Sequence, residues 1–446
     1  MKQHSLQLKA FAAAFALALP GLCLAAVSPV LTLTSTTELA GPPSCVVLNY
    51  TLADAPGIVL FDVLTNGVSI GGANIQRVSG DVNRLVQPGG NRVVRWFPGL
   101  DWPGHPAGAG DVTYRLTALP KDCPPLYMVV DLCAKSNVTY YADADFLPHG
   151  GIASDVYKAD RLAMRRIDAR GVMWQMGTAT NSPASPNNVN DRIYQFPSEK
   201  LHEVTLTNNY YIGVYQVTQT QWQQITGYNP SCFTTDRTMR PVESVSYTDI
   251  RQGKGTATTT ASATGGIYPD APYGDSFLGL LRTKTILDFD LPSEAQWEFA
   301  ARAGNGEGYW GDGSAMRISS NKDAGLEQLG RYQYNGGKIG ANNATTPAGN
   351  CEATNATAIV GSYAPNAWGL YDMHGNVWVW CLDIFANDIT ALNGAVNTVS
   401  GTDRVFRGGS WLNGAESCRP ACRSGGAASA RAYNLGFRLV CTAGLQ

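Results

Sequence analysis

NAWGLYDMHGNVW, residues 366 to 378, is the stretch of this sequence that says most about the fold. Gly369 and Gly375 permit turns or a close approach of two backbones. Trp368 and Trp378 can bury large areas, which matters because helix and strand signals are sparse around them. This part of the chain is therefore expected to be a compact domain held by buried aromatic rings and glycine turns.

Similar short blocks lie on both sides of this stretch, in a fixed order. They are WQMG 174–177, VTL 204–206, YYIG 210–213, VTQ 217–219, RPV 240–242, VSY 245–247, LPSEAQWEFAAR 291–302, RVFRGGSW 404–411 and GFR 436–438. Together these blocks resemble the formylglycine-generating-enzyme (sulfatase-modifying factor) family over residues 165–442. The resemblance implies a C-type-lectin-like α+β fold with little regular structure.

Two segments inside this region carry local helix signals. Ser293 follows Pro292 as a helix N-cap and Gly304 stands at the end, which predicts a helix over residues 294–302. The segment Thr218–Thr226 begins with a capping threonine and carries Trp222 and Ile225 at helical spacing, which predicts a second helix.

The first residues have the order of an export signal. Lys2 and Lys9 flank a polar start, an apolar run covers Ala10 to Leu19, and small residues end at Ala26. The apolar run is too short to span a bilayer. We therefore expect a signal peptide over residues 1–26, no membrane span, and a secreted or periplasmic mature chain.

Residues 27–150 show short β-rich runs separated by glycine and proline turns, which predict an immunoglobulin-like β-sandwich. The runs are Val30–Thr36, Cys45–Leu52, Ile58–Thr65, Arg92–Trp96, Val112–Leu119 and Tyr127–Asp131. The dipeptide Gly150-Gly151 indicates a linker. The expected fold class is α+β, with this β-sandwich followed by the formylglycine-generating-enzyme-like domain.

Composition limits the partners and the compartment. The 446 residues carry a net charge of -2 and only 15% charged residues, which gives no electrostatic case for nucleic acid or an anionic membrane surface. Ten cysteines fit an oxidising compartment. Arg407, Arg423 and Arg438 could tie irregular backbone carbonyls and carboxylates together.

The resemblance also implies where metals would bind. In the family's oxidases, two cysteines after the Gly-Gly-Ser-aromatic turn hold copper. Here the two positions are Asn413 and Cys418, and an amide oxygen is a poor substitute for a soft thiolate ligand of Cu(I). Cys422 forms a Cys-x-x-x-Cys pair with Cys418, which we interpret as a disulfide or two structural thiols. Bound copper is therefore not expected.

A calcium site in the family uses a carboxylate two residues beyond the position of Val377. Val379 stands there, and valine cannot ligate a hard cation. Asp372 and the carbonyl groups of Gly375 and Val377 are the remaining candidate ligands, so calcium affinity should be weakened or lost. His374 has no histidine partner at metal spacing and is interpreted as a surface or packing residue.

The segment Leu412–Asn434 is the candidate ligand-binding surface, because it is rich in small residues between two patterned blocks. Some proteins of this fold class have a C-terminal cassette diversified by a retroelement that scrambles asparagine-type codons. Scrambling of this kind cannot produce Met, Trp, Gln, Lys or Glu, and of these only Glu416 occurs in the segment. An ordinary loop of a drifted paralogue is the alternative. The proposed contacts are Leu412, Asn413, Gly414, Ser417, Ser424, Ala432, Tyr433 and Asn434.

Three functions remain open from the sequence. The first is a secreted, non-catalytic recognition protein for a protein or glycan ligand. The second is a metal-dependent oxidase of the sulfatase-modifying-factor type that uses Cys418 with Cys422. The third is a structural protein of the cell envelope.

Overall fold

The computed structural model describes most of the chain. The described residues are 27–105, 110–134, 138–178, 198–233, 239–253, 268–306, 308–319, 321–335, 356–399 and 401–442. They form a mixed α+β structure that is rich in sheet and has few helices. The predicted signal peptide, residues 1–26, lies outside the described residues. Along the described part of the chain, no helix has the length and apolar character needed to cross a bilayer.

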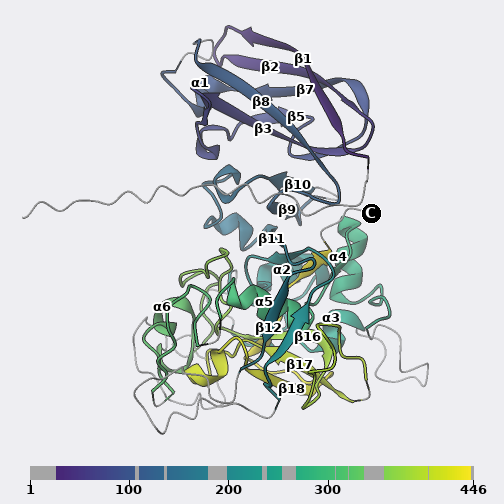
Figure 1. The fold of residues 1–446 in the computed structure, drawn as a ribbon, viewed down its shortest axis with the longest axis vertical. Helices are drawn as coiled ribbons and strands as arrows, with labels where there is room; N and C mark the ends of the chain where they lie inside the picture. Colours follow the sequence, from purple (N-terminus) through teal and green to yellow (C-terminus); the bar gives the residue numbers. More distant parts are fainter. Residues whose placement is uncertain are drawn as a thin grey trace, which may run out of the picture.

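Two sheets make up the N-terminal end of the molecule (Figure 1). One contains, in spatial order, β1 (Val30–Leu39), β2 (Cys45–Ala53), β7 (Gly89–Trp96) and β5 (Val78–Gly80). The other contains β4 (Val68–Ser69), β3 (Gly57–Thr65) and β6 (Arg84–Val86), with β8 (Val112–Pro120) also paired to β3. Side chains alternate along β2 between buried and half-buried, as a strand with one face in a core requires. Both sheets contribute to that core, for example through Tyr50, Phe61 and Trp96. The immunoglobulin-like topology stays a prediction.

The last strand expected in this region belongs elsewhere. Tyr127–Asp131 forms β9, which pairs with β10 (Val138–Tyr141) and with β11 (Arg161–Ile167). These strands begin a six-stranded sheet that continues with β14 (Tyr210–Gly213), β20 (Val440–Thr442) and β15 (Phe289–Asp290). The expected sandwich therefore loses its last strand, because a strand pattern shows the period of a segment and not its partner. In Figure 1, β9 and β10 lie between the N-terminal sheets and the C-terminal part.

The C-terminal part surrounds this sheet with short elements. A second sheet has the order β18 (Arg423–Ala427), β17 (Asp403–Arg407), β16 (Trp378–Ile384) and β19 (Leu435–Gly436), and β12 (Met173–Met176) pairs with β13 (His202–Thr205). The helices here are α2 (Gln219–Thr226), α3 (Tyr247–Arg251), α4 (Phe277–Thr285), α5 (Glu294–Arg302) and α6 (Leu326–Leu329), and α1 (Pro98–Asp101) lies in the N-terminal part. Buried aromatic rings fill the spaces between them, as the glycine- and tryptophan-rich sequence predicts.

Both predicted helices are confirmed. Thr218 caps α2 and Ser293 caps α5, each through a capping box in which the side chain accepts from the third residue of the helix.

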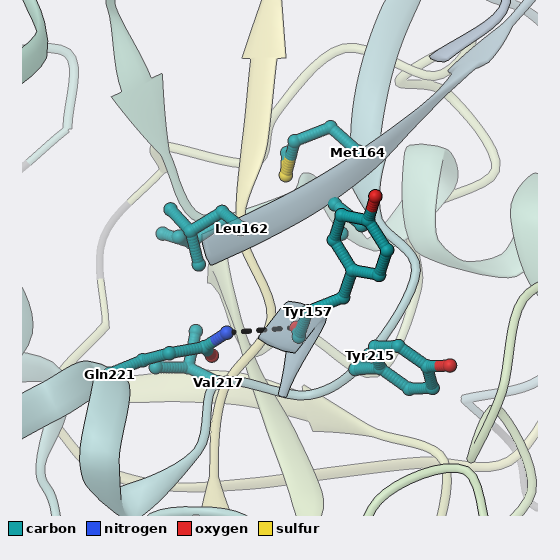
Figure 2. A pocket seen from close by; sticks show the side chains of 9 residues that line it. Tyr157, Leu162, Met164, Tyr215, Val217 and Gln221 are labelled. Atoms are coloured by element: carbon teal, nitrogen blue, oxygen red, sulfur yellow. Dashed lines mark hydrogen bonds between the residues drawn. The ribbon is translucent and has the colours of Figure 1, made fainter. Parts of the chain in front are cut away.

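The glutamine of the first box also reaches across to another element. Gln221 Nε2 donates to the carbonyl oxygen of Tyr157 at 3.2 Å, beside a cavity of only about 10 Å³ (Figure 2). A cavity of that size holds about one water molecule, so the interior next to α2 is closed to a ligand.

Candidate functional site

Helix α5 presents two glutamates to the interior, one turn apart, and three arginines meet them. Glu294 accepts two hydrogen bonds from Arg423, at 2.6 and 2.7 Å. Glu298 pairs with Arg302 and Arg407. Burial opposes ionisation of Glu298, but the two guanidinium groups outweigh it and hold the pKa of this carboxyl below its usual range. The network fixes α5 against β17 and β18.

Arginine side chains also satisfy irregular backbone, as expected for Arg407, Arg423 and Arg438. Arg407 Nη1 donates to the carbonyl oxygens of Ala421 and Cys422 at 2.9 and 2.6 Å. Arg423 Nη1 donates to those of Ser198 and Ala386. Arg438 donates to the carbonyl oxygens of Gly213 and Tyr371. These three arginines are structural.

The candidate segment Leu412–Asn434 does not form one displayed surface. Residues 414–423, which we call the anchor segment, are buried except for the half-buried Glu416 and Ser417. Arg419 within it makes a bidentate pair with the buried Glu199, at 3.0 and 3.1 Å. Gly414, a predicted contact, is buried, and a Cβ atom there would lie 2.4 Å from Glu416 Oε2. The assignment of Gly414 as a ligand contact is therefore wrong, because the anchor segment packs into the core.

Asn413 is half-buried, and its side chain is already engaged. Its Oδ1 accepts from Trp378 Nε1 at 2.9 Å and from Ser410 Oγ at 2.5 Å. Asn434 Nδ2 donates to the same Ser410 Oγ at 3.1 Å, and its carbonyl oxygen accepts from the backbone N–H of Trp378. These two predicted contacts join the beginning of the segment to its end.

The remaining part is the C-terminal face, which we define as residues 424–434. All of its residues are half-buried or exposed, including the predicted contacts Ser424, Ala432, Tyr433 and Asn434. It begins on β18, the edge strand of its sheet, which can be followed in yellow in Figure 1. Two further predicted contacts, Leu412 and Ser417, are half-buried outside it.

Tyr433 is the aromatic residue of this face. Its side chain is 38% exposed, and its ring centroid lies 5.8 Å from that of Trp411. Trp411 is buried, packs edge-on against Phe233 at 5.5 Å, and donates from Nε1 to the carbonyl oxygen of Tyr433. The exposed ring thus rests on a buried aromatic pair, a rigid arrangement suited to a ligand contact.

Arg431 is a residue of this face that the sequence did not single out. Its side chain is exposed and makes a bidentate pair with Asp249 on α3, at 2.6 and 2.7 Å. The pairing could not be predicted from the sequence, because it joins residues 182 positions apart. The pair fixes a polar, directional group two residues before Tyr433 in the chain.

Cys418, at the second implied copper position, and the nearby Cys422 are both buried. Cys418 and Cys422 are both free, so the alternative of two structural thiols holds and the disulfide does not. Burial raises the pKa of Cys418 well above its usual range and that of Cys422 to about 12. A cysteine binds Cu(I) as its thiolate, and a raised pKa opposes formation of that thiolate. With Asn413 bound to Trp378 and Ser410, this donor set does not fit copper.

The implied calcium site has lost one of its ligands. Val379 is buried in an apolar cluster with Trp297 and Val405, so it provides no oxygen. The carbonyl oxygens of Asp372, Gly375 and Val377 are all contacted by one side chain, that of Gln216, which sequence reasoning missed. No local signal could have found it, because the contacts join residues more than 150 positions apart.

His374 is a packing residue, one of the two alternatives expected. Its Nδ1 lies 3.1 Å from the carbonyl oxygen of Cys418, and its Nε2 accepts from the backbone N–H of Gly311 at 3.1 Å. This pairing places the single proton of a neutral imidazole on Nδ1. Burial lowers the pKa of His374 to about 4, so the ring is neutral at physiological pH.

A cavity of about 640 Å³, with no lining residue from the C-terminal face, lies between α4, β15 and β20. Tyr268 and Arg251 are among its lining residues. Arg251 pairs with Asp290, and Arg282, also in the lining, pairs with the same carboxylate. The volume suits a small ligand, so this cavity is the natural comparison for any ligand assigned to the C-terminal face.

Curated proteins similar to part of this chain include two that show the range of the likeness. The formylglycine-generating enzyme of Streptomyces coelicolor is 38% identical over 158 residues, which are 33% of this chain and 45% of that enzyme. The chaperone protein LppX of Paenibacillus barcinonensis is 28% identical over 223 residues, 47% of this chain and 71% of that protein. The matched part thus spans less than half the length of the formylglycine-generating enzyme.

Among solved structures, Treponema denticola variable protein 1 aligns with a TM-score of 0.43 and 25% identity, covering 63% of this chain and 95% of that one. The family model described as the sulfatase-modifying factor enzyme 1-like domain matches residues 168–443. That match covers more than half of the chain and includes every ordered block from 174 to 438. The chain therefore belongs to the sulfatase-modifying factor family, as its motifs predict.

Proposed function

We propose that this protein is a secreted or periplasmic, non-catalytic recognition protein that binds a protein or glycan ligand through its C-terminal face. The C-type-lectin-like scaffold implied by the family would carry that face. The observation that carries the proposal is the hydrogen bonding of the Asn413 side chain. It stands at the first copper position, and its side-chain oxygen is held by Trp378 and Ser410.

The division of the C-terminal segment supports a binding role. Binding sites are commonly loops carried by a rigid scaffold. Here the anchor segment is tied down through Arg419 to Glu199, and Arg423 at its end is tied to Glu294. The residues that follow are half-buried or exposed. A ligand could therefore meet small side chains around one aromatic residue, Tyr433, without disturbing the core.

The alternative function is a metal-dependent oxidase that uses Cys418 and Cys422, and a chemical assay separates the two. The full chain, loaded with copper under reducing conditions, is incubated with a cysteine-containing sulfatase-type peptide and analysed by mass spectrometry. We expect no formylglycine and no tight stoichiometric Cu(I) binding. Formylglycine that is lost in Cys418→Ser would overturn the proposal in favour of the oxidase.

Binding is tested with the labelled full chain on an array of purified glycans and on a panel of purified cell-surface proteins. The proposal expects binding to a defined class of probe. Tyr433→Ala should abolish it at unchanged melting temperature, because aromatic residues dominate binding hot spots.

Tyr268→Ala is the matched control, since Tyr268 is a half-buried tyrosine in the 640 Å³ cavity. It should leave binding intact. Binding that survives Tyr433→Ala and is lost in Tyr268→Ala would place the ligand in the cavity and contradict the assignment of the face.

Diversification of the face is a hypothesis about its origin. A near-copy of the codons for residues 412–434 beside a reverse-transcriptase gene is the expected finding in the flanking DNA. Without such a copy, the segment is an ordinary loop of a drifted paralogue, and the binding proposal stands or falls on the array alone.

A further inference from the structure

Three backbone carbonyl groups converge on one point inside the C-terminal part. The oxygens of Asp372, Gly375 and Val377 lie 3.2, 3.2 and 2.9 Å from Gln216 Nε2. Gln216 is buried, 1% exposed, in the connection between β14 and α2. Carbonyl oxygens are acceptors without protons, so three of them around one point form a site for a positive charge or for a strong donor.

The backbone of this loop explains the convergence. Asp372, Gly375 and Asn376 have φ values of 56°, 113° and 69°, in the region that most residues avoid. At Gly375 a Cβ atom would also lie 2.3 Å from the carbonyl oxygen of Arg331, so only glycine fits. Asn376 holds the turn by exchanging hydrogen bonds with the backbone of Ala358. The turn is therefore built to direct its carbonyl groups inward.

The carbonyl groups of Gly375 and Val377 are among the ligands that the family resemblance implies for calcium. The carboxylate expected to complete the site is replaced by Val379, whose side chain packs in the apolar core. What stands at the centre is an amide nitrogen. Only the orientation with Nε2 toward the carbonyl groups is attractive, because Oε1 in that place would face three oxygen lone pairs.

We propose that the Gln216 side-chain amide is a built-in substitute for the cation, so that this loop is held without calcium. The two amide protons, shared among three acceptors, supply the positive end that a divalent ion supplies elsewhere. The distances agree with this, since they are hydrogen-bond lengths. This inference concerns loop stability and does not rest on the proposed ligand.

Two substitutions at one position test it. Gln216→Met keeps the length of the side chain and removes the donors, so it should lower the melting temperature by several degrees, with no recovery in calcium. Gln216→Glu places a hard, negative oxygen ligand among the three carbonyl groups. It should be strongly destabilised in chelator and recover in calcium. If it folds only with calcium, it is purified in that ion, and its unfolding on addition of chelator is the readout.

The natural chain is the reference. Its melting temperature should be the same in chelator and in calcium, and calorimetry with calcium alone should give no binding heat. Terbium luminescence, sensitised by Trp378 next to Val377, should appear in Gln216→Glu and be absent in the natural chain. A calcium-dependent melting temperature or terbium emission in the natural chain would overturn the proposal. So would a Gln216→Met variant as stable as the natural chain, or a Gln216→Glu variant indifferent to calcium.

Discussion

The indole Nε1 of Trp378 donates a hydrogen bond of 2.9 Å to Oδ1 of Asn413. Trp378 begins β16, and Asn413 follows β17 after a turn, so the bond connects the central sheet to the start of the candidate segment. Asn413 stands at the first implied copper position, and through this bond its side chain has a structural role. The stability of this contact can be measured directly.

Asn413→Ala should destabilise the protein by about 1–3 kcal/mol, because it leaves the indole N–H of Trp378 without its acceptor in a largely buried site. Urea unfolding gives the value. The matched background is Trp378→Phe, which removes the donor. On that background, Asn413→Ala should cost clearly less. Equal costs on both backgrounds would show that the bond contributes nothing.

Trp411→Ala should cost about 3–5 kcal/mol, the range for truncating a buried aromatic residue. Trp411 is 4% exposed and packs against Phe233. Its neighbour Tyr433 serves as the comparison, because its exposed ring should cost less than about 1 kcal/mol when truncated. If the two variants lose similar free energies of unfolding, Tyr433 is a packing residue and not a displayed one.

Arg419→Met should cost about 3–5 kcal/mol, because it leaves Glu199 charged, buried and without its bidentate partner. The double variant Glu199→Gln, Arg419→Met removes both charges and should recover much of this loss. Chemical denaturation of the natural chain and of the two variants gives the comparison. A neutral Arg419→Met would mean that the anchor segment is not held by this pair.

Stability should fall as pH drops below 6.5, in part because of His374. The folded pKa of about 4 lies below the ordinary 6.5, so the unfolded chain takes up the proton first. The contribution is present above pH 6.5 and is lost as pH falls toward 4, by about 3 kcal/mol at most. Burial beside Trp310 is the main cause. The hydrogen bond to the Cys418 carbonyl group and the charge of Asp312 oppose it, and Arg302 adds to it.

Other carboxyl groups also titrate in this range, so the test compares two chains. His374→Gln should be less stable at neutral pH, yet its free energy of unfolding should fall less steeply between pH 6.5 and 4.5. Identical slopes in the two chains would show that His374 does not contribute to acid sensitivity.

Local signals in the sequence were enough to predict the helices and most N-terminal strands. Ser293 and Thr218 define helix starts within four residues of chain, and the alternation in β2 is a property of its own nine residues. Long-range contacts were not predictable. Arg419 pairs with Glu199, which lies 220 positions away in the sequence. Because no local signal indicates such a contact, the whole segment was interpreted as one loop, although residues 414–423 are largely buried.

The same limit applies to the candidate site. The poor fit of Asn413 to copper could be predicted from the residue type alone, because metal preference depends on the ligand atom of the side chain. Gln216 could not be found this way, because its role comes from three carbonyl groups that the fold brings to it. Tyr433 was predicted as a contact from its type, and the structure adds Arg431 through its pairing with Asp249.

The division of the C-terminal segment leads to a prediction about tolerance to substitution. In a library covering residues 412–434, displayed on cells and selected for resistance to protease, positions 427, 429 and 433 should accept most residues, because they are exposed. Positions 414, 418, 419 and 423 should accept very few, since Gly414 has no room for a Cβ atom and both arginines neutralise buried glutamates. Sequencing before and after selection gives the measurement. Uniform tolerance would mean that the anchor segment is not core, whereas uniform intolerance would mean that the face supports the fold. In the second case the C-terminal face could not serve as a variable binding surface, and the recognition proposal would have to move to the cavity lined by Tyr268.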